Sequence, residues 1–432
     1  MSSCFSGSLF TGYPQQLAPL KAALQDPQQD AKTPIEALTT GLEEDDQLLY
    51  AQELGRSSQI QGDFKQSILY YQRAIAAYQA FDRQAIISAT RSAETAGALL
   101  VNDKMLTYQG IPLERIMLHQ YQALNFLMQR RVDKALVEVR RMHEQLKLEQ
   151  KNVTDGVAND LDNGQVDQTI HKLEQSANIV SPSLNAYSYA FAGLIYELAN
   201  QPNDAYIDYR KALRLQRKQS YLQSNLTRLA QQLKLPQRHR FIKKWGQPAT
   251  QQPNQGRLVI LVDRGFVVPK QEIFLPIFGQ TRIHSVAMPT YASYQQGTQA
   301  PLNIKGSAKP IQIDALADIN QLAIKSLAEA YPGIVVRQIA RLVAKEQMSQ
   351  ASGNSNMNSV FQITNFLTEQ ADLRSWLTLP SQTAIGQQFI DKGQYNLHIN
   401  GQIVPVLIKS QQTTVIWALM FNQHLQLHSV TI

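Results

Sequence analysis

The chain has 432 residues, of which 44% are hydrophobic and 17% are charged. This length suffices for two or three domains, and the composition excludes wholesale disorder. The 41 basic and 34 acidic residues give a net charge of +7, which favours anionic surfaces without selecting one. A single cysteine, Cys4, excludes an intramolecular disulfide, and no apolar run is long enough to span a bilayer.

Residues 1–45 contain four prolines among glutamines and alanines, which predicts a flexible N-terminal extension that acts as a tether. At its start, Ser2-Ser3-Cys4 matches the end of a bacterial lipoprotein cleavage site, although the chain carries no basic and apolar leader before it. Cys4 is therefore a lipidation candidate if a signal lay upstream, and a free thiol otherwise.

Residues 46–235 are predicted to be helical, because apolar residues recur every three or four positions and prolines are few. Three segments of this region, 52–75, 121–143 and 191–213, align with one another. Small residues coincide at two positions twelve apart, and larger residues follow four positions later: Gly55, Ala123 and Gly193, then Ser67, Ala135 and Ala205, then Tyr71, Val139 and Tyr209. Small residues allow two antiparallel helices to cross closely, so the pattern resembles the tetratricopeptide repeat.

Residues 236–256 are predicted to be a linker, because a basic and aromatic cluster leads into a stretch rich in Pro, Gln and Asn. We interpret the basic cluster as a solvated helix end rather than a site that binds nucleic acid or a membrane surface. Residues 257–432 are predicted to form an α+β domain with an antiparallel sheet. A helix over 313–331 should stop at Pro332-Gly333, and Asn400-Gly401 has the composition of a tight hairpin turn.

No cofactor or metal is predicted. Asp160 and Asp162 lie in a polar segment, but a calcium loop there would carry aliphatic residues at two ligand positions. His424 and His428 share one face of a predicted strand without a nearby carboxylate or cysteine, so an exposed edge strand is favoured over a zinc site.

The segment T-E-Q-A-D-L-R-S-W-L-T-L-P, residues 368–380, concentrates Glu369, Asp372, Arg374 and Trp376. Three interpretations remain open: a structural junction, a ligand-binding site, or an acid/base pair of Glu369 and Asp372. The junction is favoured, because Arg374 is placed to pair with a carboxylate. An acid/base pair also requires a cleft that separates the two pKa values.

Several motifs in the same order, among them Q-G-D-F, L-V-D-R-G-F-V-V-P-K and T-E-Q-A-D-L-R-S-W-L-T-L-P, make the chain resemble a family of uncharacterised proteobacterial lipoproteins over residues 48–410. Members combine tetratricopeptide-like helices with an α+β domain. The resemblance implies a lipid on Cys4 and a place in the cell envelope, and it transfers no biochemical activity. With an upstream signal the protein would lie on the periplasmic side of the outer membrane, and without one in the cytoplasm.

Two hypotheses follow. In the first, the protein is a non-enzymatic scaffold whose helical groove binds another envelope protein or peptide. The repeat's groove-facing positions map onto Leu49, Gln52, Arg56, Gln120, Leu124, Tyr187 and Glu197. Packing against a neighbouring helix is the alternative at each of these positions. In the second hypothesis, the protein is an envelope-polymer hydrolase that uses the acidic and basic cluster at 369–374.

Overall fold

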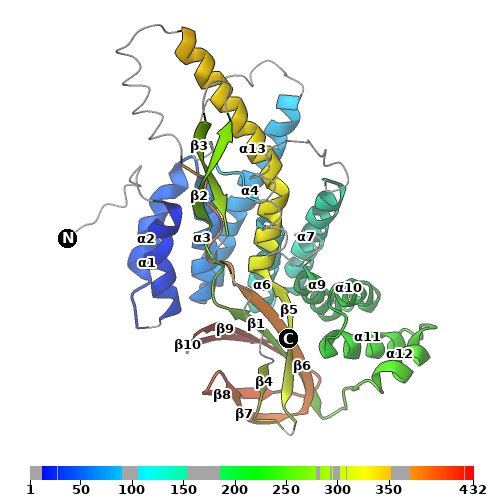
Figure 1. Cartoon of the computed structure of the whole chain (residues 1–432). Coiled ribbons are helices and arrows are strands. Elements are labelled where there is room, and N and C mark those ends of the chain that lie inside the picture. The colour runs from blue at the N-terminus through cyan, green and yellow to red at the C-terminus, as the bar shows by residue number, and fades with distance from the viewer. Residues whose placement is uncertain are drawn as a thin grey trace.

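The computed structural model describes residues 12–26, 28–89, 106–152, 185–278, 283–291, 294, 302–307, 309–351, 370–422 and 424–432. Helices of the N-terminal half lie against a sheet that the C-terminal half builds (Figure 1). The predicted class, a helical repeat region followed by an α+β region with a largely antiparallel sheet, is confirmed.

The helices that precede the sheet pack mainly as antiparallel hairpins, α3 with α4, α6 with α7 and α9 with α10. Their bounds are α1 (Tyr13–Gln25), α2 (Lys32–Leu38), the 3-10 helix η1 (Thr39–Glu43), α3 (Gln47–Ile60), α4 (Phe64–Ala89), α6 (Pro112–Met128), α7 (Val132–Asn152), α9 (Ala186–Leu198), α10 (Pro202–Leu215), α11 (Ser220–Gln232) and α12 (Arg238–Trp245). All nine aligned repeat positions are buried, which confirms the repeat.

Gly55 marks the closest approach of α3 and α4. A Cβ atom added there would lie 2.4 Å from Cδ1 of Tyr71, and the Ser67 hydroxyl donates a hydrogen bond to the Gly55 carbonyl at 2.6 Å. Gly193 meets Tyr209 in the same way at the crossing of α9 and α10. Small residues are therefore required where the two helices of a hairpin touch.

We expect Gly55→Ala to lower the free energy of unfolding by about 1–3 kcal/mol, because the added methyl overlaps a buried ring that has no room to move. Gly333→Ala is the matched control. It lies in α13 (Ile319–Ala351), where an added Cβ meets nothing closer than an arginine nitrogen at 3.5 Å, so a gain of about 0.5–1 kcal/mol is expected. Urea denaturation of both variants measures the difference, and equal effects would contradict the packing argument.

The central sheet has six strands in the order β10-β9-β1-β6-β5-β4. The strands are β1 (Gln255–Arg264), β4 (Leu302–Ile304), β5 (Ile311–Asp318), β6 (Gln382–Asp391), β9 (Thr413–Phe421) and β10 (His424–Thr431). β1 pairs in parallel with β9 and antiparallel with β6. Because β1 is buried on both faces, its sequence is a continuous apolar run rather than an alternating one.

The two faces of the sheet contribute to different cores. Val259 and Leu261 of β1 face the helices, whereas Leu258 and Ile260 face the hairpin of β7 (Gly393–Ile399) and β8 (Gln402–Ile408). The turn between β7 and β8 has Asn400 and Gly401 at φ of 49° and 78°, as the tight turn predicted for this pair requires. The sheet thus carries the helical repeats on one face and a β-hairpin on the other.

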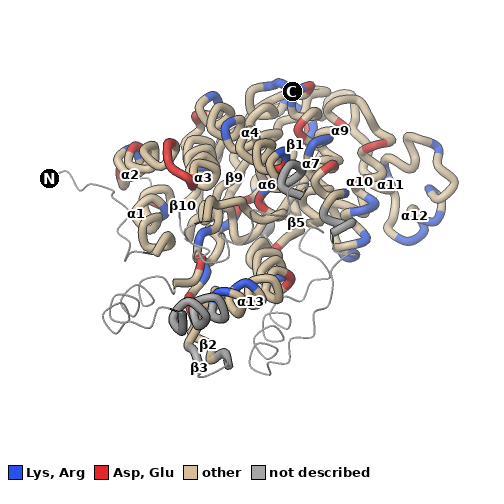
Figure 2. Tube along the Cα trace, turned by 90° about the horizontal axis from the view of Figure 1, so that it is seen from above, with Lys and Arg blue, Asp and Glu red and all other residues tan. Residues whose placement is uncertain are grey.

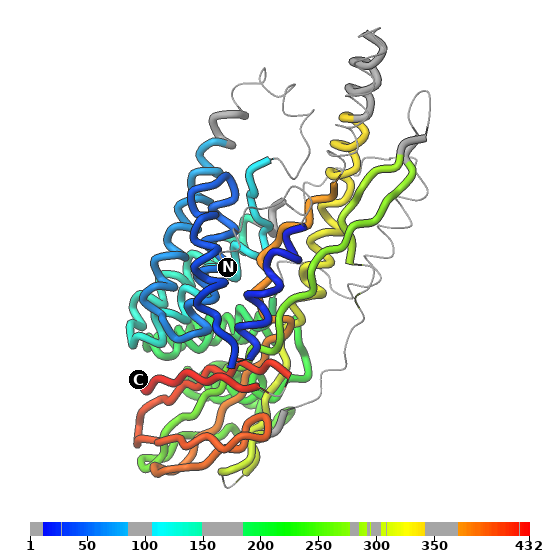
Figure 3. Tube along the Cα trace, turned by 90° about the vertical axis from the view of Figure 1, so that its left-hand side faces the viewer, coloured from blue at the N-terminus to red at the C-terminus, as the bar shows by residue number. Residues whose placement is uncertain are grey.

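A second pair of strands, β2 (Gln271–Phe278) and β3 (Ile283–Thr290), packs along α13 to form an arm beside the helical region (Figure 3). The helix predicted over 313–331 is wrong at both ends, because residues 313–318 belong to β5 and α13 continues through Pro332. Tyr331 and Val335 on either side are fully buried against β2 and β3. This packing outweighs the missing N–H and the steric cost of the proline.

Two further expectations are corrected. The extension expected to be flexible at 1–45 contains α1, α2 and η1, and Leu17 and Leu20 of α1 are fully buried in the main core. Pro14 lies in the first turn of α1, where the missing N–H costs nothing, so it starts the helix. The linker expected at 236–256 contains α12. The connection between α12 and β1 is therefore shorter than predicted and begins after Trp245.

Candidate functional site

An extended segment, residues 371–380, passes between the helical repeats and the sheet. The N–H of Trp376 donates to Glu114 Oε1 at 2.8 Å, and the N–H groups of Leu377 and Thr378 donate to Glu53 at 2.6 and 3.1 Å. Two helix carboxylates thus accept three consecutive backbone N–H groups. The segment belongs to no helix or strand. The two carboxylates therefore provide the acceptors that backbone carbonyls would provide in a helix or a sheet.

Trp376 anchors the segment. Its ring packs edge-on against Tyr71 at 5.8 Å and Tyr121 at 6.3 Å between centroids, and its indole N–H donates to Thr378 Oγ1 at 3.1 Å. The side chain is almost completely buried. The aromatic rings come from two different helical hairpins, so Trp376 ties both hairpins to the segment.

Arg374 is the centre of an ion-pair cluster. It donates to both oxygens of Asp372 at 2.9 Å, to Asp46 Oδ1 at 2.6 Å and to the Leu106 carbonyl at 2.9 Å. Burial pushes the pKa of Asp372 up, but the hydrogen bonds and charge of Arg374 outweigh it and hold that pKa below its usual value. A carboxylate held ionised in a bidentate pair is a structural acceptor and does not serve as a general acid.

A buried ion pair joins the helices to β1. Arg56 of α3 donates to Asp263 Oδ2 at 2.6 Å, and the same oxygen accepts from the Tyr121 hydroxyl and the Trp417 indole N–H, both at 3.1 Å. The guanidinium carbon lies 3.9 Å from the Tyr121 ring centroid. Both charged side chains are almost fully buried, so each depends on the other for compensation.

A second ion-pair network joins α9 to the sheet. Glu197 accepts from Arg257 of β1 at 3.0 Å, from Arg228 of α11, and from the Tyr209 hydroxyl at 2.8 Å. Burial alone would raise the pKa of Glu197, but the two arginines lower it below its usual value. Asp314 connects β5 to α11, because it accepts a hydrogen bond from the Tyr221 N–H in the first turn of α11 at 2.6 Å.

The chain's own C-terminal half occupies the groove that the sequence analysis expected to be open to a partner. Arg56 and Glu197 reach the sheet, whereas Gln52 donates to Tyr78 at 3.1 Å and Gln120 accepts from Ser188 at 2.6 Å within the helical region. The other three side chains are buried in the main core: Leu49, Leu124 and Tyr187. Binding of a separate protein at these positions stays a prediction, and it would require the C-terminal half to leave.

Sequence reasoning missed Glu53, Glu114 and Asp263, which hold the two halves together. A signal for them exists in the sequence. Asp263 ends the apolar run L-V-I-L-V of a buried strand, and Glu53 stands on the helix face that carries Leu49. An isolated charge within an otherwise apolar face predicts a buried partner, because an unpaired buried charge is too costly.

Glu53 should make stability depend on pH. Burial raises its pKa to about 7, against hydrogen bonds from Thr378 and Leu377 that lower it. Because the folded pKa is raised, the stabilising contribution is fully present below the unfolded pKa near 4.5 and is lost as pH rises to about 7. We expect the difference in unfolding free energy between wild type and Glu53→Gln to change by about 3 kcal/mol across this window. A difference that stays constant from pH 4.5 to 7.5 would contradict this assignment.

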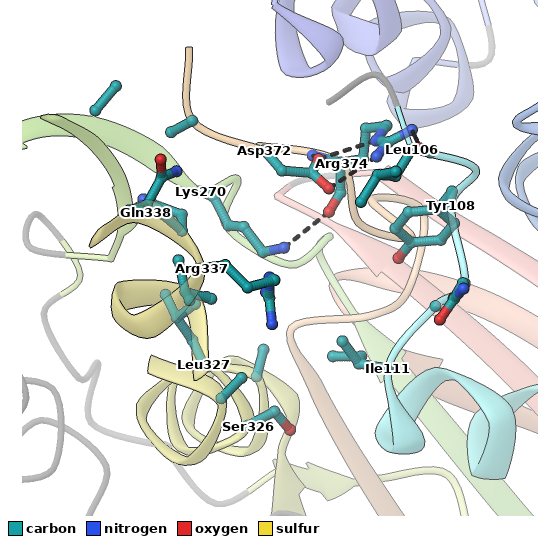
Figure 4. A pocket seen from close by; sticks show the side chains of 18 of the residues that line it. Leu106, Tyr108, Ile111, Lys270, Ser326, Leu327, Arg337, Gln338, Asp372 and Arg374 are labelled. Carbon is teal, nitrogen blue, oxygen red and sulfur yellow. Dashed lines mark hydrogen bonds and ion pairs between the residues drawn. The ribbon is translucent and has the colours of Figure 1, made fainter. Parts of the chain in front are cut away.

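Beside the segment lies a cavity of about 410 Å³ between α13, β3, residues 106–111 and residues 371–374. Its charged lining residues are Lys270, Arg337, Asp372 and Arg374 (Figure 4). Lys270 Nζ donates to the Arg374 carbonyl at 2.8 Å, and burial lowers the pKa of Lys270. The cavity therefore adjoins the predicted junction, since Asp372 and Arg374 of the ion pair line it.

Cys4 and Glu369 lie outside the described residues, as does the segment with Asp160 and Asp162. His424 and His428 lie on β10 as expected, and His428 Nε2 lies 2.7 Å from the Ile60 carbonyl at the end of α3. In the described part of the chain, no group of three or more His, Cys, Asp or Glu is arranged to hold a metal. No helix in that part has the length and apolarity needed to cross a membrane.

No protein-family model matches the sequence, and no curated protein matches it. Among solved structures, three of MamA resemble the fold over 49% of this chain. Two have TM-scores of 0.28 and 0.27 and identities of 10% and 11%, and cover 82% and 76% of the MamA chains. The third, a MamA RS-1 double mutant, has a TM-score of 0.27 and 10% identity and is covered over 79% of its length. Similarity this low assigns no function.

Proposed function

We propose that this chain is a non-enzymatic, protein-binding scaffold of the bacterial cell envelope, held at a membrane by a lipid on Cys4. The observation that carries the proposal is the segment in the groove. The helical repeats bind an extended stretch of polypeptide through carboxylates on its backbone N–H groups and an aromatic pocket for Trp376. Recognition of extended peptide is thus within the chemistry of these helices.

Because the groove is occupied, we place the partner on the outer surface of α10 to α12. Residues 209–245 contain eleven Lys and Arg and no Asp or Glu, although the net charge of the whole chain is only +7. Figure 2 shows Lys and Arg gathered around α12 and the neighbouring loops. Eight of these basic residues are exposed: Arg210, Arg214, Arg217, Lys218, Lys234, Arg240, Lys243 and Lys244. Charge complementarity favours a protein partner with an acidic segment.

The arrangement of α12 supports this surface as a docking site. Phe241 is buried and packs on Trp245 at 4.7 Å between centroids, so the aromatic face of the helix is turned toward the protein. Arg240, Lys243 and Lys244 are spaced three and four apart and lie together on the exposed face. The helix therefore presents a charged surface whose binding should weaken steeply with salt.

Photo-crosslinking in native envelopes tests the proposal. A photoreactive residue at Lys243 should crosslink to another protein, and one at Gln52 should crosslink only within the chain. The variant Arg240→Glu, Lys243→Glu, Lys244→Glu should lose the partner. A control that reverses the same number of charges elsewhere, Lys32→Glu, Lys65→Glu, Lys309→Glu, should keep it. Equal capture by both variants, or no intermolecular product at Lys243, would overturn the docking site.

The membrane anchor has its own test. Mass spectrometry of the mature protein from envelopes should show an acylated N-terminal Cys4, and Cys4→Ser should move the protein to the soluble fraction. An unmodified thiol together with unchanged fractionation of the variant would refute the anchor and leave the scaffold without its proposed location.

A further inference from the structure

The cavity beside residues 371–374 has the size of a small-molecule site, and its lining is partly apolar and partly cationic. Its volume of about 410 Å³ lies within the range of ligand pockets, which is roughly 300–1,000 Å³. One wall is apolar and comes from α13, β3 and residues 106–111. Its aliphatic members include Leu106, Ile111, Ala287, Pro289, Leu327 and Ile334. Such a wall suits a hydrocarbon chain.

Two cationic side chains also line the cavity, Lys270 from the connection before β2 and Arg337 from α13 itself. Figure 4 shows Lys270 and Arg337 reaching from different elements into the same space, above Ser326 and Leu327 of α13. The nearby carboxylate, Asp372, is turned to Arg374 in a bidentate pair at 2.9 Å. The one acidic side chain among the described lining residues therefore has its charge engaged by Arg374.

Lys270 is the lining residue best placed to bind an anionic group. Its ammonium donates to a neutral acceptor, the Arg374 carbonyl, and among the described residues no carboxylate forms an ion pair with it. Burial lowers the pKa of Lys270, and the negative charges of Asp372 and Glu114 offset only part of this effect. An anion in the cavity would supply both the counter-charge and an acceptor for the remaining N–H bonds.

We infer that this cavity binds an anionic amphiphile, whose head group pairs with Lys270 and whose alkyl chain lies along the apolar wall of α13. The head is a carboxylate, as in a fatty acid, or a phosphate monoester, as in a lipid fragment. Both present oxygens that an ammonium recognises. The inference concerns a different surface from the proposed docking site on α12, so either can fail without the other.

Isothermal titration of the purified full chain tests the inference with four probes. Decanoate and decyl phosphate have both an anionic head group and a ten-carbon alkyl chain. The probe 1-decanol has the alkyl chain without the charge, and acetate has a carboxylate without the long chain. We expect decanoate, decyl phosphate or both to bind at one site, 1-decanol to bind at least about tenfold more weakly, and acetate to give no measurable binding. The ratio of the two anions identifies the head group.

Three variants complete the test. Lys270→Met removes the charge but keeps most of the side-chain length, and it should weaken anion binding by about tenfold or more. Lys65→Met on the exposed face of α4 should leave anion binding unchanged. Ala330→Phe fills the cavity from an exposed helix position, so it should abolish binding without unfolding the protein. Absence of binding to wild type, equal affinity for 1-decanol, or binding that survives both Lys270→Met and Ala330→Phe would overturn the inference.

Discussion

Arg56→Met should lower the free energy of unfolding by about 3–5 kcal/mol. The substitution leaves Asp263 as an uncompensated charge between the helical repeats and β1, where the side chain is almost fully buried. The Tyr121 hydroxyl and the Trp417 N–H still donate to it, but neutral donors replace only part of the lost ion pair. Urea denaturation followed by far-UV circular dichroism measures the loss.

Two controls isolate the mechanism. Lys32→Ala removes an exposed ion pair with Glu36 at 3.9 Å and should change stability by less than about 0.5 kcal/mol. Arg56→Met combined with Asp263→Leu removes both charges and should recover much of the loss, because apolar side chains of similar size replace buried pairs well. A double variant as unstable as Arg56→Met would show that packing, and not the unpaired charge, causes the loss.

Trp376→Ala should also cost about 3–5 kcal/mol, because it empties the space between Tyr71 and Tyr121 and removes the anchor of the segment. Trp245→Ala is the matched control. Trp245 is half-buried at the end of α12 and packs on Phe241, so its removal should cost less than half as much. Similar losses for both tryptophans, measured by urea denaturation, would contradict a central role for the segment.

The helical repeats could be predicted from the sequence because their determinants are local. Gly55 and Tyr71 are sixteen positions apart, and their spacing recurs in Gly193 and Tyr209. The hairpin turn at Asn400-Gly401 was predictable for the same reason, since a positive φ restricts the residue types directly. Such patterns depend on neighbouring backbone and need no knowledge of the tertiary fold.

The occupied groove was not predictable in this way. Glu53 and Thr378 are more than 300 positions apart in the sequence. No local pattern predicts that a carboxylate on a helix will accept backbone N–H groups from a distant segment. The helix through Pro332 and the helices α1 and α2 were missed for a related reason. Proline lowers the local helix propensity, while burial of Tyr331 and Leu17 in tertiary contacts outweighs this cost.

The central claim is that residues 376–378 lie buried in the groove of their own chain. Amide hydrogen exchange of the full-length protein tests it most directly, because this segment belongs to no helix or strand and its protection can come only from such burial. The amides of Trp376, Leu377 and Thr378 should exchange as slowly as those of β1, through near-global unfolding, and Glu53→Ala should speed the exchange of Leu377 and Thr378. Exchange of these amides at the rate of an exposed loop would show that the segment leaves the groove and would contradict the account.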